Sequence, residues 1–247
     1  MDLTRQPYVL LVLSLAVLYA AAEIGNILRL KPLAEDERDD YTIVIGATLT
    51  LLGLLVGFVF SMAISRYDQR KNYEEAEANA IGTEYVRLDF LPAQDAATGR
   101  DLLKKYVDLR IQYYTTRSGD GLTKIDSKTA QVQDQLWALM RPLAQTPNPV
   151  MALVVSGMND VLNSQGYTQA AWRNRIPHAA WLLMASIAAF CNFLIGFGSR
   201  QVDRRLFIIL PLAVSVAFFL ISDIDTPRGG AITVAPQNLI TLQQSLK

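Results

Sequence analysis

The chain has 247 residues, 51% of them hydrophobic, and its 23 basic residues balance its 23 acidic ones. Zero net charge without a Lys/Arg run argues against bulk nucleic-acid binding, and a single Cys excludes an intramolecular disulfide. A soluble domain would disperse its apolar residues at helical or strand period, but here they are gathered into blocks. The blocks are Tyr8 to Ala22, Ile43 to Ile64, Ala179 to Phe197 and Leu206 to Ile221.

These blocks predict an all-α membrane protein with four transmembrane helices. The second and third reach the length of about 20 residues that a spanning helix needs, and the others do so with their polar ends. The first helix, Pro7 to Leu28, could be mistaken for a signal peptide, because Ala20 to Glu23 offers small residues for cleavage. Its one basic residue, Arg5, is balanced by Asp2, so we expect it to stay uncleaved.

Glu23 lies in the last turns of the first helix, close to the membrane interface. An ionisable residue there is a functional candidate, although the carboxylate could simply reach headgroup water or pair with a basic loop residue. The following loop, Arg29 to Tyr41, is acidic between Glu35 and Asp40 and is predicted to be a solvated turn.

One long helix is predicted from Thr42 to Phe90. Its first half has no charge, its character changes at Ser65, and no proline occurs before Pro92. Such a helix would be about 70 Å long at 1.5 Å rise per residue. That is more than twice the roughly 30 Å hydrocarbon core of a bilayer, so the polar half must project into water.

Small residues recur at steps of four or three along the first half and therefore share one face of the helix. One interpretation is a packing seam, since small residues let helices approach closely in lipid. The other is the wall of a pore formed where several copies meet. The stripe consists of Thr42, Gly46, Thr50, Gly53, Gly57, Ser61 and Ser65.

The polar half begins with Arg66, Asp68, Arg70 and Lys71, which would ring the mouth of such a pore. Its charges are spaced for i,i+3 and i,i+4 pairs on a solvated face, such as Lys71 with Glu74. Three further helices are expected to pack against it as an extramembrane bundle. The first runs from a capping box at Thr98 to Asp101 through Thr116, and the second from Thr123 to Gln145. The third runs from Val150 to Leu162 and resumes after a break through Trp172.

The third span follows Pro177, and His178, the only histidine, cannot by itself assemble a His-rich metal site. The fourth span ends at Asp223-Ile224-Asp225, a spacing that could attract Ca²⁺. The favoured alternative is a C-terminal turn whose aspartates accept local backbone N–H groups. The tail from Ala231 is expected to add a short strand-like piece and a final helical turn.

Four spans would put both termini and the bundle on one side of the membrane. Ion pairs are then expected at each face. They would join Asp223 and Asp225 to basic residues among Arg66, Arg70, Arg173 and Arg175, and Glu23 to Arg200, Arg204 and Arg205. Basic residues in the short loops favour a bundle outside the cytoplasm, whereas counting those that flank the bundle reverses the result. The predicted domains are 1–64 (spans one and two), 65–176 (bundle), 177–222 (spans three and four) and 223–247 (tail).

Several segments resemble the bacterial "bestrophin-like domain" family, small four-span membrane proteins of largely unassigned function. They are Gly57 to Ala63, Ser65 to Tyr67, Glu75 to Thr83, Leu91-Pro92 and Asp223 to Gly229. The resemblance covers about Thr42 to Val234 and implies, at one remove, an oligomeric ion channel. True bestrophins are pentameric anion channels whose second span lines the pore. This chain does not match their calcium-clasp run or aromatic neck, so a pentamer rests only on distant resemblance.

The sequence has no catalytic or phosphate-binding motif, so we expect neither an enzyme nor a cofactor. We predict a homo-oligomeric ion channel of the cell (inner) membrane, in contact with lipid, further copies and small inorganic ions. The alternatives are a non-conducting scaffold or sensor whose bundle binds a partner, and a transporter that uses Glu23 as a proton-coupled carboxylate. The predicted pore wall is Gly46, Thr50, Gly53, Gly57 and Ser61, and the bundle would form a vestibule.

Overall fold

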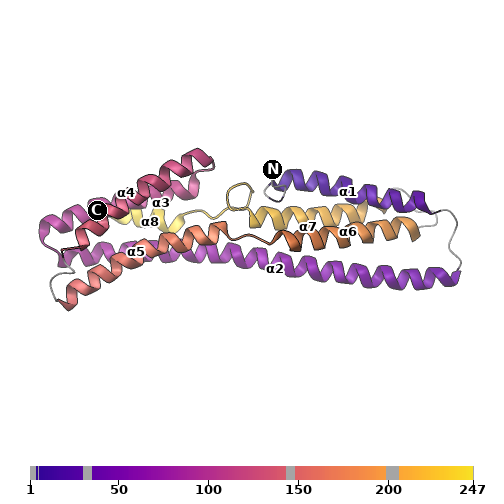
Figure 1. The fold of residues 1–247 in the computed structure, drawn as a ribbon, viewed down its shortest axis with the longest axis horizontal. Helices are drawn as coiled ribbons and strands as arrows, with labels where there is room; N and C mark the ends of the chain where they lie inside the picture. Colours follow the sequence, from indigo (N-terminus) through magenta and orange to yellow (C-terminus); the bar gives the residue numbers. More distant parts are fainter. Residues whose placement is uncertain (1–3, 5, 30–34, 143–147, 199–205, 247) are drawn as a thin grey trace. The chain divides into compact units, whose positions relative to one another are not determined.

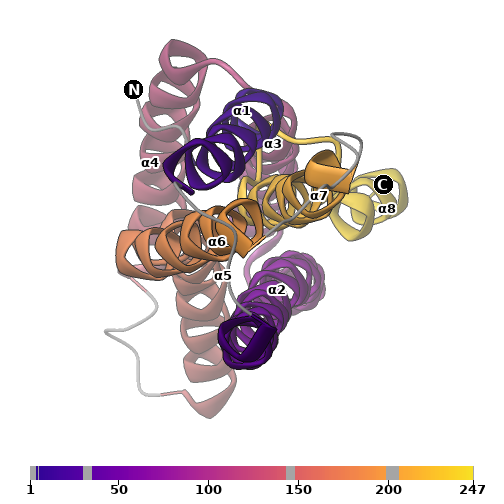
Figure 2. The same cartoon turned by 90° about the vertical axis from the view of Figure 1, so that its right-hand side faces the viewer.

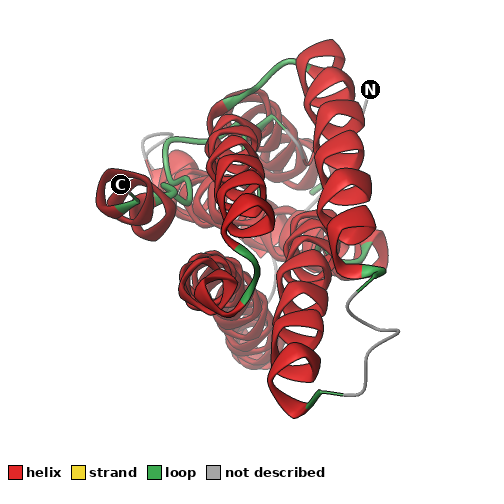
Figure 3. Cartoon of the chain, turned by 90° about the vertical axis from the view of Figure 1, so that its left-hand side faces the viewer, coloured by secondary structure: helices red, strands yellow, loops and turns green. Residues whose placement is uncertain are grey.

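The structure is a computed structural model that describes residues 4, 6–29, 35–142, 148–198 and 206–246. Within this part of the chain every regular element is a helix and no strand occurs (Figure 3). The all-α prediction is therefore confirmed. The α-helices are α1 (Pro7–Leu28), α2 (Glu35–Arg87), α3 (Ala93–Thr115), α4 (Gly119–Met140), α5 (Pro149–Arg173), α6 (His178–Gly198), α7 (Ile209–Asp225) and α8 (Gln237–Ser245). Short 3-10 helices, η2 (Leu88–Phe90) and η4 (Leu206–Ile208), follow α2 and precede α7.

The chain divides into two compact units. Met1–Arg66 and Arg175–Thr233 form the first, which we call the span unit, and Tyr67–Asn174 and Val234–Lys247 form the second, the bundle unit. Helix α2 has residues in both units. Three helical segments, Pro7–Leu28, Asp39–Phe90 and Pro149–Gly198, are long and apolar enough to cross a membrane, among the residues that the structure places. Helix α7, at 17 residues, is not one of them, so the four-span topology stays a prediction.

In the span unit, α1 packs along α6 and α7 (Figure 2). The contact between α1 and α6 is backbone to backbone. A Cβ added at Gly196 would lie 1.9 Å from the Ala22 carbonyl oxygen, and one at Gly25 would lie 2.1 Å from that of Phe193. These two glycines therefore let the helices meet more closely than any side chain would allow, as small residues do between helices in lipid.

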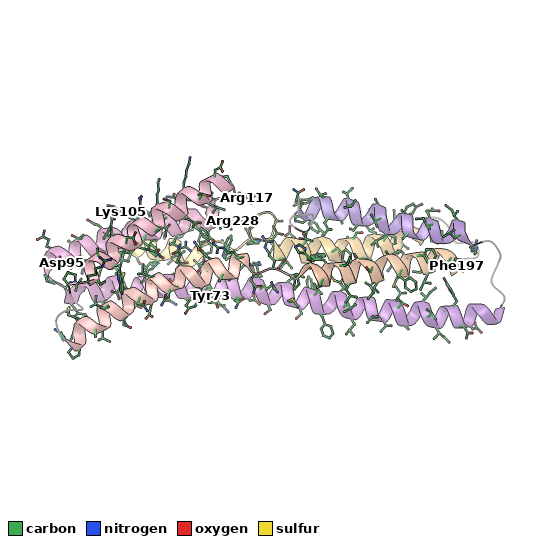
Figure 4. The ribbon with its side chains drawn as sticks, in the orientation of Figure 1. Tyr73, Asp95, Lys105, Arg117, Phe197 and Arg228 are labelled. Atoms are coloured by element: carbon green, nitrogen blue, oxygen red, sulfur yellow. The ribbon has the colours of Figure 1, made fainter. Side chains whose placement is uncertain are left out.

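In the bundle unit, α3, α5 and α8 pack against one face of the polar half of α2 (Figure 1). Helix α3 lies against α4 and α8, and α4 against α5. The wholly buried core side chains include Ile81, Leu88, Leu103, Tyr106, Leu136, Met158 and Leu239. Tyr73 on α2, which is labelled in Figure 4, stacks on Tyr167 of α5 with ring centroids 6.0 Å apart.

Several predicted helix boundaries are wrong. Helix α2 begins at Glu35 and not at Thr42, since acidic residues favour the first turn of a helix. Helix α3 begins at Ala93 with Pro92 before it, so Thr98 is no cap, and its hydroxyl donates to the Gln94 carbonyl inside the helix.

Helix α4 starts at Gly119 and not at Thr123, where the sequence predicts its start. The Ser118 hydroxyl accepts the Gly121 N–H and so caps this helix. Helix α5 is continuous through residue 162, and the predicted end of the preceding helix at Gln145 lies outside the described residues. The strand-like piece expected near Ala231 is wrong as well, because the N–H groups of Ala231 and Ile232 bind the Asp223 carboxylate and are not free to pair with a strand.

Candidate functional site

The predicted pore-wall residues lie on an uncovered face of α2. Gly46, Thr50, Gly53, Gly57 and Ser61 are all exposed in the single chain. A Cβ added at Gly46, Gly53 or Gly57 would meet no described atom within 4 Å. The Thr50 hydroxyl donates to the Gly46 carbonyl at 2.8 Å, so its lone pairs remain available on that face. The stripe is thus not a packing seam inside one subunit.

A different face of α2 packs within the span unit. Leu52, Val59 and Ala63 are buried there, at 3%, 6% and 0% exposure. Large apolar side chains off the stripe are also uncovered, among them Leu51, Leu54 and Phe58. Contacts within the chain therefore bury only one narrow edge of the apolar half of α2.

The predicted pore-mouth charges have separate surroundings. Asp68 and Lys71 are exposed, and the Lys71 ammonium lies 6.0 Å from the centre of the Tyr67 ring. Arg66 is partly exposed, with its guanidinium 3.6 Å from Met62 Sδ. Arg70 is fully buried.

The Arg70 guanidinium occupies the end of α5. Its Nε donates to the Ala171 carbonyl at 3.3 Å and its Nη2 to that of Asn174 at 3.4 Å. A basic side chain at a helix C-terminus satisfies carbonyls that have no partner within the helix and complements the helix dipole. In the single chain, the charge of Arg70 therefore serves the packing of α5.

Glu23 is partly buried near the end of α1 and accepts a hydrogen bond from the Tyr19 hydroxyl at 2.8 Å. Tyr19 stands one turn before it on the same helix, so this contact is local. The expected partners Arg200, Arg204 and Arg205 lie outside the described residues.

The carboxylates of Asp223 and Asp225, which follow the fourth apolar block, accept hydrogen bonds from backbone N–H groups. Asp223 accepts the N–H groups of Ala231 and Ile232, each at 2.8 Å, and a Cβ at Gly230 would lie 2.5 Å from its Oδ1. Asp225 accepts the Ile176 N–H at 3.2 Å. Asp223 thus binds backbone N–H groups of the segment that directly follows it, as expected of an aspartate in such a turn, whereas the Asp225 partner is 49 residues away in sequence. No cluster of three or more metal-ligating side chains occurs among the residues that the structure describes.

Arg175, an expected ion-pair partner of these aspartates, does reach this turn. Its Nη1 donates to the Asp225 backbone carbonyl at 2.9 Å and to the Thr226 hydroxyl at 3.2 Å. The contact is therefore made in part through backbone and hydroxyl oxygens, and the turn after α7 is fastened to the segment that precedes α6.

Sequence reasoning missed a buried polar face on the second half of α2. Side chains at heptad spacing point into the bundle, and helix α5 runs antiparallel along them. The face consists of Arg70, Glu74, Glu77, Ile81 and Glu84 of α2 and of Leu88 at the start of η2, all of them buried. Charges that stand in register with Ile81 and Leu88 were the signal that this face is covered.

Glu77 is the centre of this face. Its Oε1 pairs with Arg110 Nε of α3, and its Oε2 accepts from Arg110 Nη2 at 3.3 Å, Thr168 at 3.1 Å and Tyr114 at 3.5 Å. Burial raises the pKa of the Tyr114 hydroxyl, and the Glu77 charge raises it further. One carboxylate therefore joins α2 to both α3 and α5.

Glu74 binds the start of α8. Its Oε1 accepts the Leu239 N–H at 2.9 Å, and its Oε2 accepts from the Asn238 side chain at 2.6 Å. A carboxylate at this end satisfies an N–H without a partner in its helix and complements the helix dipole. Glu74 thereby attaches the C-terminal helix to the bundle unit.

The apolar helices and the helical bundle define the class first: a helical membrane protein with an all-α polar unit. A model of the Bestrophin-like domain matches residues 16–239. The chain therefore belongs to the Bestrophin-like family, a family of membrane proteins, and the resemblance seen in the sequence is confirmed.

Solved structures share the fold. The bacterial Bestrophin homologue from Klebsiella pneumoniae is similar at a TM-score of 0.67 and 14% identity, over 95% of this chain and 96% of that one. Two variants of the Klebsiella pneumoniae homologue give TM-scores of 0.69 and 0.67 at 14% and 15% identity; the alignments cover 96% of this chain with either variant, and 97% and 95% of theirs. No match is found among curated protein sequences. At these identities the likeness establishes the fold alone.

Proposed function

We propose that the protein is a homo-oligomeric ion channel in which α2 of each copy turns its small-residue face toward a central path. The observation that carries the proposal is the exposure of Gly46, Thr50, Gly53, Gly57 and Ser61, with open space above the glycines. Family membership supports it, since bestrophins are channels as a class.

Self-association follows from what α2 leaves uncovered. Within the most apolar 18-residue stretch of its candidate span, 11% of the residues are buried. Lipid can cover the exposed side chains of Leu51, Leu54 and Phe58. A face of glycines and hydroxyls offers lipid chains little apolar side chain to contact. Small residues on a membrane helix instead favour close approach to another helix or to a water-filled path.

At the polar end of this face lie Asp68, Lys71 and the partly exposed Arg66. These residues, contributed by every copy, would form a ring of charge around the mouth. Rings of charge select ions by sign, and a ring of mixed sign gives weak selection. We therefore expect a channel for small inorganic ions in which this mouth selects only weakly by sign. Both termini and the bundle unit would lie on one side, outside the cytoplasm by the charge of the short loops, which a reporter fused after Lys247 tests.

Purified protein in liposomes tests the channel. We expect voltage-clamped currents that Gly57→Leu or Ser61→Phe reduces by at least tenfold, because either change fills the path in every copy. Leu51 is also exposed but lies off the stripe. Leu51→Phe is therefore the matched control and should leave the current unchanged.

Silence of the wild type across ions and pH would favour the rival function, a scaffold or sensor whose bundle binds a partner. The mass of the purified assembly provides an independent check. A monomer under conditions that preserve the fold would contradict the proposal, because an axial path requires several copies around one axis.

A further inference from the structure

Glu84 is a buried carboxylate without the partners that other buried carboxylates of α2 have. Its side chain is 0% exposed, and neither oxygen accepts a hydrogen bond from the described part of the chain. The nearest cationic atom is Arg87 Nη1, 3.8 Å from Oε2, on a side chain that is itself 32% exposed. By contrast, Glu77 has Arg110 and two hydroxyls, and Glu74 has donors at the start of α8.

The Glu84 carboxyl lies against the backbone of α5 at Gly157, in a space that we call the seat. This space exists because residue 157 has no side chain. A Cβ at Gly157 would lie 2.0 Å from Glu84 Oε2 and 2.2 Å from Arg87 Nη1. The carboxyl therefore rests on the backbone of α5, where no other side chain intervenes. Any residue larger than glycine would force Glu84 and Arg87 to move.

The charges around this seat do not stabilise an anion well. Burial raises the pKa of Glu84 to about 8, Arg87 on α2 lowers it in part, and Asp160 on α5 adds to the rise. An ionised carboxylate that is buried without hydrogen bonds loses its hydration and gains little in return. At neutral pH the group therefore favours its protonated form inside the bundle unit.

We propose that Glu84 is a proton-binding site that couples pH to the contact between α2 and α5. In the protonated state the neutral carboxyl stays seated at Gly157. When the proton leaves to solvent, the carboxylate moves toward water with Arg87, and the middle of α5 loosens from α2. The proton is the ligand, and the exchange requires no further reactant.

The proposal fixes the sign of a pH dependence. An unfolded glutamate has a pKa of about 4.3, and the folded value is raised. The folded state therefore binds more protons than the unfolded state between the two values. The contribution of Glu84 to the free energy of unfolding decreases as pH rises from about 4.3 to about 8 and is constant above that range.

Thermal unfolding of the full chain in nanodiscs between pH 5 and 9 tests the proton site. We expect Glu84→Gln to remove a decrease in melting temperature that the wild type shows on going from pH 5 to 8, and to melt higher than the wild type at pH 8. Glu75→Gln changes an exposed carboxyl of the same helix and should follow the wild type. If Glu84→Gln and the wild type show parallel profiles, the proposal is overturned.

Hydrogen exchange tests the loosening of α5 and uses the wild type as well. After correction for the intrinsic pH dependence of exchange, peptides around Gly157 should lose protection between pH 6 and 9 while those of α4 do not. Unchanged protection of α5 in the wild type would overturn the coupling even if Glu84→Gln did not fold. Gly157→Ala should damage the wild type more than it damages Glu84→Ala, and additive effects would show that the two residues do not meet in this way.

Discussion

The apolar half of α2, residues 39–66, and its polar half, residues 67–87, differ in what they bury. The apolar half leaves its stripe of small residues exposed and fully buries few of its large side chains, Leu52 and Val59 among them. The polar half buries Arg70, Glu74, Glu77 and Glu84. Hydrophobicity alone would predict the reverse, and the reason lies in the surroundings. A helix in lipid needs no cover for apolar side chains, whereas a helix in water can bury charges where partner helices supply donors and cations.

The largest effect is expected from Arg110→Ala. It leaves the Glu77 carboxylate buried beside two hydroxyls without its cation, and removal of one partner of a buried pair costs about 3–5 kcal/mol. Thermal or denaturant unfolding, followed on the bundle unit, should show this loss. Lys105 on the same helix is exposed (Figure 4). The control Lys105→Ala should therefore change the free energy of unfolding by less than about 0.5 kcal/mol. Equal effects of both variants would mean that the polar half of α2 does not depend on its buried pair.

Gly196→Val should have the next largest effect, and it acts on the span unit. Its added atoms would overlap the Ala22 carbonyl, which is backbone and cannot swing aside. Overpacking of this kind costs about 1–3 kcal/mol and more where backbone must shift. Melting of the detergent-solubilised protein measures it. A melting temperature equal to that of the wild type would show that α1 and α6 do not touch at Gly196.

Glu74→Ala should release α8 without unfolding the rest of the bundle unit. Loss of a side chain that caps a helix N-terminus costs about 0.5–2 kcal/mol, and Asn238 and Leu239 would lose their acceptor. Limited proteolysis of the tail should become several-fold faster. Glu75→Ala, one residue away and exposed, should keep the wild-type rate.

Gly53→Ala should have the smallest effect on a single chain and so sharpens the contrast with Gly196. Nothing lies near its added Cβ, and alanine favours a helix over glycine by about 0.5–1 kcal/mol. We expect the melting temperature of dilute protein to stay equal or rise slightly. If sister copies pack against this face, the oligomer should dissociate more readily, which mass measurements at falling concentration would detect.

Helix existence could be read from the chain because it depends on local chemistry. Apolar blocks of spanning length, Pro92 and Pro177 as breaks, and the uninterrupted run after Ser65 indicated α1, α2, α3, α6 and α7. Boundaries were less certain where two local rules competed. The Ser118-Gly119 pair suits a turn and a helix cap equally, and the cap forms because Ser118 accepts the Gly121 N–H.

The charged run after Ser65 shows where local reasoning fails. The spacing of Lys71 and Glu74 predicts an ion pair on a solvated face. The Glu74 carboxylate instead accepts the N–H of Leu239 at the start of α8, a residue 165 positions later in the sequence. A carboxylate on a helix has the same i,i+3 and i,i+4 neighbours whether water or another helix covers it. What covers it depends on residues that no local window contains.

The sequence by itself determined that this protein is helical, that its apolar blocks suit a membrane, and that small residues share one face of its longest helix. These properties follow from helical periodicity and hydrophobicity, which act over neighbouring residues. Only the tertiary structure decided that this face stays uncovered in the single chain while Glu77 meets Arg110 and Glu84 meets Gly157. Those outcomes depend on which distant helix supplies a cation, a donor or an empty place.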